Sequence, residues 1–283
     1  MAVFKITART VLHLGAELIS SDQIALYELI KNAFDAKSQE VIIDIIIRIS
    51  QVKYERLRQT LRDAGIAKHR VGLQAMTDIK KDIITTLDAS APFLNDFKSK
   101  VQNCDSLTEL VDVLDSANYI DIKDTGEGMS LDDLEDVYLT IGTRSRRGER
   151  ERQRSLFSLE ENPEEVIRPV LGEKGVGRLS AMRLGRQLRV RSKKKGYDHW
   201  SYLSIDWSKF SHDSDELLEE VDAIKLRQGR RQVDSNLSGT TLTISGLTSE
   251  WTTIKLEEIA RDEFSKLTDP FTPEKRYPIK LRF

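Results

Sequence analysis

Residues 22–36 read DQIALYELIKNAFDA, and this stretch decides the fold that the rest of the sequence completes. Residues 20–22, SSD, are good helix N-caps directly before an apolar period, so we predict a helix over about residues 22–37. Glu28, Asn32 and Asp35 follow at i, i+4 and i+7, which places two carboxylates and an amide in one stripe. Taken alone, such a stripe is typical of a solvated helix surface, so its meaning depends on two later segments.

The two later segments are rich in glycine. DTGEGM (residues 124–129) follows a predicted strand over 119–123, and its glycines allow a tight turn and a close approach to a flat ligand. The Asp124 carboxylate can accept a hydrogen bond from an exocyclic amine. GEKGVGR (residues 172–178) opens a predicted helix that ends near residue 184. Glycines at a helix start expose backbone N–H groups, which suit a phosphate chain.

Three common nucleotide-binding patterns are excluded. The Walker string GxxxxGK[ST] does not occur, and Ser180 stands where a dinucleotide-binding fingerprint requires its third glycine. The HRD and DFG strings of protein kinases are absent as well. Residues 172–178 therefore match none of these three patterns.

Composition excludes further classes. The 283 residues carry 44 Lys and Arg against 46 Asp and Glu, a net charge of −2, which excludes a globally basic nucleic-acid binder. One cysteine, Cys104, excludes a disulfide framework, and the four histidines lack metal-ligand spacing. The most apolar run, residues 41–49, contains Asp44 and Arg48 and is too short to span a bilayer. We therefore expect a cytoplasmic protein without a membrane partner.

Hydrophobic patterning predicts the remaining elements. A short helix is expected over residues 131–140, with Ser130 as its cap, and a last helix over residues 253–267. Residues 52–118 are expected to be helical, and the polar residues 143–169 to be a loop. The predicted strands are 41–49, 119–123, 187–191, 199–206, 240–245 and the final YPIKLRF.

Together and in this order, the three segments resemble the motifs of the Bergerat-fold ATPases, the GHKL superfamily. Residues 28–36 resemble its N box, residues 124–129 its first glycine box and residues 172–178 its second. A Gly-Thr pair before a strand, Gly239-Thr240, also matches. The resemblance covers about residues 20–50 and 118–250. In motif style it is closest to MORC and MutL proteins and to the ninety-kilodalton heat-shock chaperone.

The resemblance implies an α+β two-layer sandwich, with a mixed, mostly antiparallel sheet, helices on one face and a helical insertion. It implies that Glu28 is the general base, that Asn32 binds Mg²⁺, and that Asp124 accepts the adenine amino group. Thr240 would support Asp124 through a water, and residues 143–169 would form the ATP lid. The remaining implied ATP-binding positions are Asp35, Gly126, Gly128, Met129, Thr143, Gly172, Lys174, Gly175, Val176, Gly177 and Arg178.

The sequence departs from the family between two of its predicted strands. Residues 51–117 are much longer than the usual connection, and we interpret them as a helical insertion, with a hairpin as one form. Dimer contact, partner docking and effector sensing remain open as its uses. Residues 1–283 are expected to form one ATPase domain. The family's second lobe is not evident before Phe283, so this domain is expected to be the N-terminal part of a longer protein.

The function implied is Mg²⁺-dependent ATP binding and slow hydrolysis, used as a lid and dimerisation switch in a DNA-related or defence-related machine. An ATP-dependent homodimer is expected, and nucleic acid could be contacted through Arg144 to Arg154 and Lys193 to Lys195. One alternative is a nucleotide-gated binding module without hydrolysis. A second is the ATP-binding domain of a sensor histidine kinase, which needs a phospho-acceptor histidine, and only His13 precedes Glu28.

Overall fold

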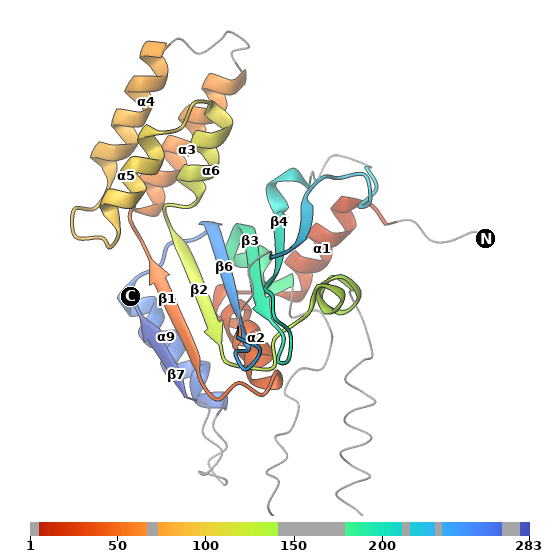
Figure 1. Cartoon of the computed structure of the whole chain (residues 1–283). Helices are drawn as coiled ribbons and strands as arrows, with labels where there is room; N and C mark the ends of the chain where they lie inside the picture. Colours follow the sequence, from red (N-terminus) through yellow and green to blue (C-terminus); the bar gives the residue numbers. More distant parts are fainter. Residues whose placement is uncertain (1–5, 67–72, 141–178, 211–215, 230–233, 268–277) are drawn as a thin grey trace, which may run out of the picture.

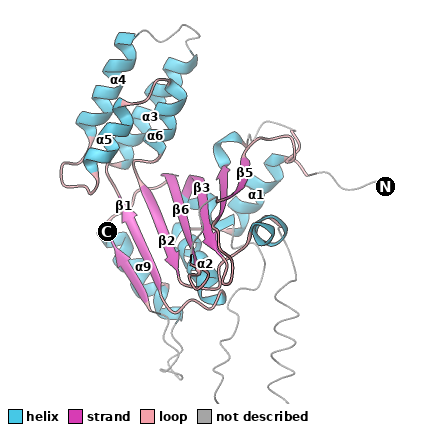
Figure 2. Ribbon diagram, viewed as in Figure 1, coloured by secondary structure: helices cyan, strands magenta, loops and turns pink. Residues whose placement is uncertain are grey.

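The computed structural model describes residues 6–66, 73–140, 179–210, 216–229, 234–267 and 278–283. In these residues seven strands form one sheet in the order β5-β4-β3-β6-β2-β1-β7 (Figures 1 and 2). Neighbouring strands are antiparallel except β1 and β7, which are parallel. The strands are β1 (Val41–Ile46), β2 (Tyr119–Asp124), β3 (Gly185–Lys193), β4 (Ser201–Asp206), β5 (Ile224–Gln228), β6 (Gly239–Leu247) and β7 (Ile279–Arg282).

Helices cover one face of this sheet. The inward-pointing side chains of its central strands, such as Ile43, Ile122 and Ile244, are at most 1% exposed and pack in the same core as these helices. The predicted α+β two-layer sandwich is therefore confirmed. No helix among the described residues is long and apolar enough to cross a membrane. The covering helices are α1 (Ala8–Leu18), α2 (Asp22–Asp35), α8 (Ser180–Leu184) and α9 (Thr253–Asp262), with short helical turns at Asp133–Tyr138, Trp207–Lys209 and Phe264–Leu267.

Helix α2 begins and ends as its sequence indicates. The Ser21 side chain accepts a hydrogen bond from the Ile24 amide over 3.2 Å, which caps the first turn. Leu26 and Leu29 are at most 1% exposed and point into the sheet core. The helix ends two residues before the predicted Lys37, which has a left-handed φ of 63°. Burial of this apolar side fixes which stripe of α2 faces away from the core.

The helical insertion (residues 51–117) is confirmed as helical but has four helices where a hairpin would have two. They are α3 (Gln51–Ile66), α4 (Leu73–Thr86), α5 (Leu94–Gln102) and α6 (Leu107–Asp115). Their buried side chains, including Tyr54, Leu61 and Leu110, form a hydrophobic core separate from that of the sheet. The insertion stands beyond one end of strands β1 and β2 (Figure 1).

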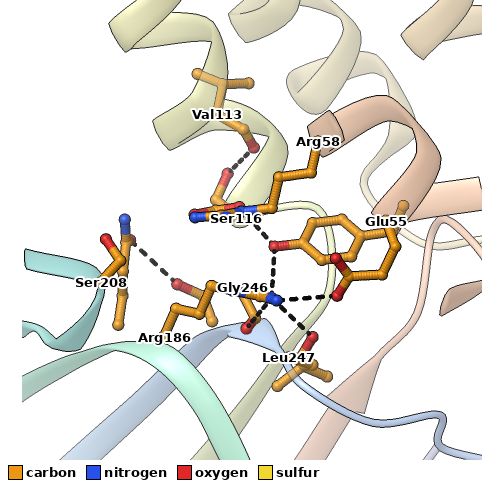
Figure 3. A network of polar contacts seen from close by, with 12 residues as sticks. Glu55, Arg58, Val113, Ser116, Arg186, Ser208, Gly246 and Leu247 are labelled. Carbon is orange, nitrogen blue, oxygen red and sulfur yellow. Dashed lines mark hydrogen bonds and ion pairs between the residues drawn. The ribbon is translucent and has the colours of Figure 1, made fainter. Parts of the chain in front are cut away.

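A polar network joins the helical insertion to the sheet (Figure 3). Asp115 accepts hydrogen bonds from the Tyr54 hydroxyl over 2.5 Å and from Arg58 Nε over 2.9 Å. Arg186, at the start of β3, donates to Glu55 of α3 over 3.0 Å. Burial, together with the neighbouring Asp115 carboxylate, raises the pKa of Tyr54 above its ordinary value. The network therefore pairs the buried charges of Arg58 and Asp115 where the two separate cores meet.

Two elements and several boundaries differ from the sequence analysis. Helix α1 and strand β5 were not predicted. Strand β1 ends at Ile46 rather than at residue 49. The reason is Asn118, whose side-chain oxygen accepts hydrogen bonds from the amides of Arg48 and Ile49 over 2.8 and 3.1 Å. This side chain replaces the partner strand and turns the chain into the insertion.

Candidate functional site

The Asp124 carboxylate lies at the end of β2, directly opposite Thr240 of β6. Its Oδ1 accepts hydrogen bonds from the backbone amides of Gly126 over 2.8 Å and Thr240 over 3.3 Å. Its Oδ2 has no hydrogen bond to any part of the chain that the structure describes. Burial raises the pKa of this carboxyl to about 6, although the two amides act in the opposite direction. One oxygen is thus fixed, and the other remains as an acceptor for a ligand.

Ser192 of β3 is a site residue that sequence reasoning missed. Its hydroxyl accepts a hydrogen bond from the Met129 amide and shares another with the Thr240 hydroxyl, both over 2.8 Å. The expected role of Thr240, support of Asp124 through a water, stays a prediction. The Thr240 backbone amide contacts Asp124 directly, while the hydroxyl faces Ser192. The place of Ser192 in the site becomes apparent only from the pairing of three strands, because nothing in the local sequence distinguishes this residue.

The two glycines of the first glycine segment lie where the chain approaches itself closely. A Cβ atom at Gly126 would lie 2.5 Å from the carbonyl oxygen of Ala36. Gly128 has a φ of 68°, and a Cβ there would lie 1.8 Å from the carbonyl oxygen of Lys193. Side chains at these positions would push the turn away from α2 and from β3. The glycines therefore hold the turn between both elements.

Backbone contacts bring the C-terminal end of α2 to this turn. The Glu127 amide donates to the Ala36 carbonyl over 2.9 Å, and the Thr125 amide donates to the Ser38 hydroxyl over 3.0 Å. Asp35 directly precedes Ala36, and Asn32 lies one helical turn earlier. The structure thus brings the polar stripe of α2 and the first glycine segment together at one end of the sheet.

Glu28 and Asn32 occupy the same stripe of α2, and both side chains are partly exposed. The Glu28 carboxylate accepts a hydrogen bond from Lys31 Nζ over 3.0 Å. The side-chain amide of Asn32 makes no hydrogen bond to the residues that the structure describes. Helix α8, which follows residues 172–178 in the chain, packs against α2. Helix α2 therefore contacts the first glycine segment and also the helix that follows the second glycine segment in the sequence.

Several predicted site residues fall outside the described residues. They include the lid, residues 143–169, and the arginines from Arg144 to Arg154. The predicted ATP-binding positions with no described placement are Thr143, Gly172, Lys174, Gly175, Val176, Gly177 and Arg178.

The expectation that Lys193 to Lys195 contact nucleic acid is wrong for the first lysine. Lys193 is 0% exposed, and its ammonium donates to the carbonyl oxygens of Tyr197 and Leu237. Lys194 forms an ion pair with Asp133 over 2.8 Å. A run of three lysines suggests a solvated patch, but the chain after β3 folds back and supplies carbonyl acceptors that enclose one of them.

Comparisons with known proteins agree with this geometry. Residues 101–240 match the family model for histidine kinase-, DNA gyrase B-, and HSP90-like ATPases. The matched range contains Asp124, Ser192 and Thr240, and it leaves out α2, which reaches the site through Ala36 and Ser38. No curated protein matches the chain. Residues 101–240 are therefore identified as a GHKL-type ATPase domain, similar to those of histidine kinases, DNA gyrase B and HSP90.

Proposed function

We propose that this domain binds ATP with Mg²⁺, hydrolyses it slowly and uses the cycle as a conformational switch. The observation that carries this proposal is the Asp124 carboxylate, which has one oxygen fixed by two backbone amides and the other without a described partner. An oxygen of this kind suits the exocyclic amine of adenine. Discrimination against guanine follows, because guanine presents a carbonyl oxygen at that position and would face the carboxylate.

The residues of α2 fit the phosphate end of a nucleotide. Mg²⁺ prefers oxygen ligands and usually keeps several waters, so one side-chain oxygen together with the phosphates suffices to hold it. The Asn32 amide oxygen would supply that ligand. Within the described residues no group of three His, Cys, Asp or Glu side chains forms a metal site, which agrees with an ion held jointly with substrate. When bound, Mg²⁺ neutralises charge on the phosphates.

Glu28 lies one helical turn before Asn32, so both side chains project toward the same end of the site. In the proposed reaction the Glu28 carboxylate orients a water toward the terminal phosphate and accepts its proton. General-base assistance of this kind is worth about 10²–10⁴-fold in rate. The Lys31 ammonium bonds Glu28 Oε1 over 3.0 Å, so the proton goes to Oε2 unless this ion pair opens.

Two substitutions on α2 test these roles. Glu28→Gln should lower phosphate release by about 10²–10⁴-fold and leave ATP affinity unchanged, because the base acts in the transition state. Asn32→Ala should weaken ATP binding in the presence of Mg²⁺ but not in its absence. Glu17→Gln on α1 serves as the matched control, because Glu17 is exposed outside the site. A wild-type rate of phosphate release in Glu28→Gln would remove Glu28 from the mechanism.

A nucleotide-gated binding module without hydrolysis is the second candidate, and the Glu28–Lys31 ion pair favours it. If Lys31 occupies Glu28 permanently, wild type binds ATP without turnover. Lys31→Met would then start hydrolysis by freeing the carboxylate. If wild type already turns over, Lys31→Met changes the rate only modestly. Steady-state phosphate release from the two proteins separates the candidates.

The proposed switch is closure of residues 143–169 over bound ATP, followed by formation of a homodimer. Ordering of a segment by nucleotide is a known type of switching transition. We propose that a DNA-related or defence-related machine uses this closure. The resemblance of residues 172–185 to MORC and MutL proteins supports the DNA-related role. Hydrogen exchange across residues 143–169 and sedimentation, each with and without a non-hydrolysable ATP analogue, test closure and dimerisation. Unchanged exchange in that segment would contradict the lid.

A further inference from the structure

A pocket of about 410 Å³ lies between the helical insertion and the sheet. Its strand residues include Tyr119 and Asp121 of β2 and Arg189 of β3, and α5 of the insertion supplies Phe97 and Lys100. These strand side chains alternate with Ile120 and Ile122, which point into the core beneath the sheet. Asp124 shares the side of Ile122. The pocket therefore lies on the sheet face opposite to the candidate ATP site.

Arg48 makes this pocket chemically unusual. The side chain lines the pocket, yet the residue is only 5% exposed. Its Nε and Nη1 atoms donate to the carbonyl oxygens of Pro92 and Ala117 over 3.0 and 2.8 Å. No carboxylate lies within ion-pair distance of its guanidinium in the described part of the chain, and Nη2 makes no described hydrogen bond. A buried cation is costly unless an anion accompanies it, so the pocket is suited to an anionic ligand.

The other charged side chains of the pocket also favour an anionic ligand. Lys100 and Arg189 are exposed, and neither forms an ion pair with another described residue. The lining also contains the carboxylates of Asp96 and Asp121. Asp121 already accepts a hydrogen bond from Thr243 over 2.6 Å and lies 3.6 Å from the ammonium of Lys123. Three cations thus face two carboxylates, and one of those carboxylates already has a cation beside it.

Aromatic side chains in the pocket favour a flat ligand. The Arg48 guanidinium lies 5.4 Å from the ring centroids of both Phe97 and Tyr119. Phe93 also lines the pocket but is 66% exposed, and its φ is 58°, a strained conformation for a residue other than glycine. Phe97 is buried, at 3% exposed, so Phe93 and the half-buried Tyr119 supply the accessible ring surface, which suits a flat base that carries a phosphate. A volume of about 410 Å³ lies within the usual range for small-molecule sites.

We propose that this pocket binds a nucleoside monophosphate, at a site separate from the ATP site on the other face of the sheet. The phosphate lies against Arg48, Lys100 and Arg189, and the base lies against Phe93 or Tyr119. This site gives the helical insertion a role as the wall of a ligand pocket. The proposal does not depend on ATP hydrolysis or on the assignment of Asp124.

Calorimetric titration with GMP, CMP, UMP and AMP tests the site. GMP, CMP and UMP do not contain adenine, which Asp124 is proposed to bind. Their binding therefore reports on this pocket whether or not the assignment of the ATP site is correct. We expect at least one of the four to bind with a 1:1 ratio. Lys100→Met combined with Arg189→Met should weaken that binding at least tenfold. Both side chains are exposed, so the double variant tests the site without removing the buried Arg48. Lys98→Met is the matched control, because Lys98 lies on α5 but does not line the pocket.

The outcomes separate the proposal from its rivals. Absence of binding by all four nucleotides at millimolar concentration would overturn it. Binding that the double variant leaves unchanged, or that Lys98→Met weakens equally, would also overturn it. Inorganic phosphate that binds as tightly as the nucleotides would contradict the role of the aromatic rings. A single-stranded oligonucleotide that binds far more tightly than any mononucleotide would replace the proposed ligand with a nucleic acid.

Discussion

Asp124 and Thr240 lie directly opposite each other on neighbouring strands, and the Thr240 amide donates to Asp124 Oδ1 over 3.3 Å. The Gly126 amide binds the same oxygen over 2.8 Å. Because both backbone bonds use Oδ1, the fold depends on one carboxylate oxygen and leaves the other for a ligand. The structural role of Asp124 and its proposed ligand-binding role can therefore be separated by mutation.

Asp124→Asn should lose ATP binding while the fold gains stability at neutral pH. An asparagine oxygen at the Oδ1 position keeps both amide bonds, and its NH₂ group replaces the free acceptor. Because burial raises the pKa of Asp124 to about 6, stability is lost as the pH rises from about 4 to about 6, and the whole loss is present at neutral pH. The variant should therefore unfold at higher urea concentration, with a gain of about 1–3 kcal/mol. ATP calorimetry and urea denaturation measure the two effects.

Asp44→Asn is the control for that experiment, since Asp44 is an aspartate of a neighbouring strand with the opposite shift. Burial acts to raise the pKa of Asp44, but bonds from Arg282 and Lys123 outweigh it and lower the pKa. This variant should lose stability at neutral pH and keep ATP affinity. Equal ATP affinity in wild type and Asp124→Asn would remove Asp124 from the site.

Adenosine binding should weaken as the pH falls through about 6. In this range the folded protein takes up a proton on Asp124, because the carboxyl pKa is raised to about 6. Protonation removes the charged acceptor that the adenine amine needs. The affinity at about pH 5 should be roughly tenfold lower than at about pH 7. Adenosine is used because, unlike ATP, it carries no phosphate that titrates in this range. A flat profile would show that the base does not contact this carboxyl.

Gly128→Ala should destabilise the protein far more than Gly196→Ala. Both glycines have a positive φ, 68° and 84°, so both substitutions bring the same kind of backbone strain, about 1–2 kcal/mol. A Cβ at Gly128 would lie 1.8 Å from the Lys193 carbonyl oxygen, whereas one at Gly196 meets nothing within 4 Å. The additional cost at Gly128 should be about 1–3 kcal/mol. Equal unfolding free energies for the two variants would contradict the close approach of the turn to β3.

Asp115→Ala should destabilise the helical insertion by about 3–5 kcal/mol. Asp115 is 1% exposed, and its removal leaves the buried Arg58 guanidinium without its carboxylate. Hydrogen exchange should accelerate in α3–α6 and stay unchanged in β2 and β6, because the insertion has its own core. The double variant Arg58→Met/Asp115→Leu should recover most of the lost stability. Acceleration spread evenly over the whole chain would show that the two cores unfold together.

Local patterns in the sequence predicted most of the sheet and its main helices. Ser21 before an apolar period fixed the start of α2, and the Ile- and Val-rich run from Val41 predicted β1. The end of β1 was not predictable in this way, because it depends on the Asn118 side chain, some 70 residues later in the chain. Strand β5 was missed because its five residues carry too few apolar side chains to stand out.

Candidate site residues that lie in sequence motifs were predicted. Those that are brought to the site only by the pairing of strands were missed. Asp124 was identified from its glycine-rich turn, and the structure places α2 against that same turn through Ala36. Ser192 lacks any local signal, because its importance comes from facing Met129 and Thr240 across strands. The burial of Lys193 was equally unpredictable, because its acceptors are carbonyl groups supplied by later turns.

The register of β1 and β2 has a consequence for the connection between these strands. Ile46 and Tyr119, the residues on either side of the insertion, are direct partners across the two strands. Their Cα atoms are therefore only about 5 Å apart, a distance that a tight hairpin turn spans equally well. Gain, loss or exchange of the whole helical unit would leave the strand order intact. The pairing of β1 with β2 therefore tolerates either a short or a long connection, and the insertion can vary in length without disturbing the sheet.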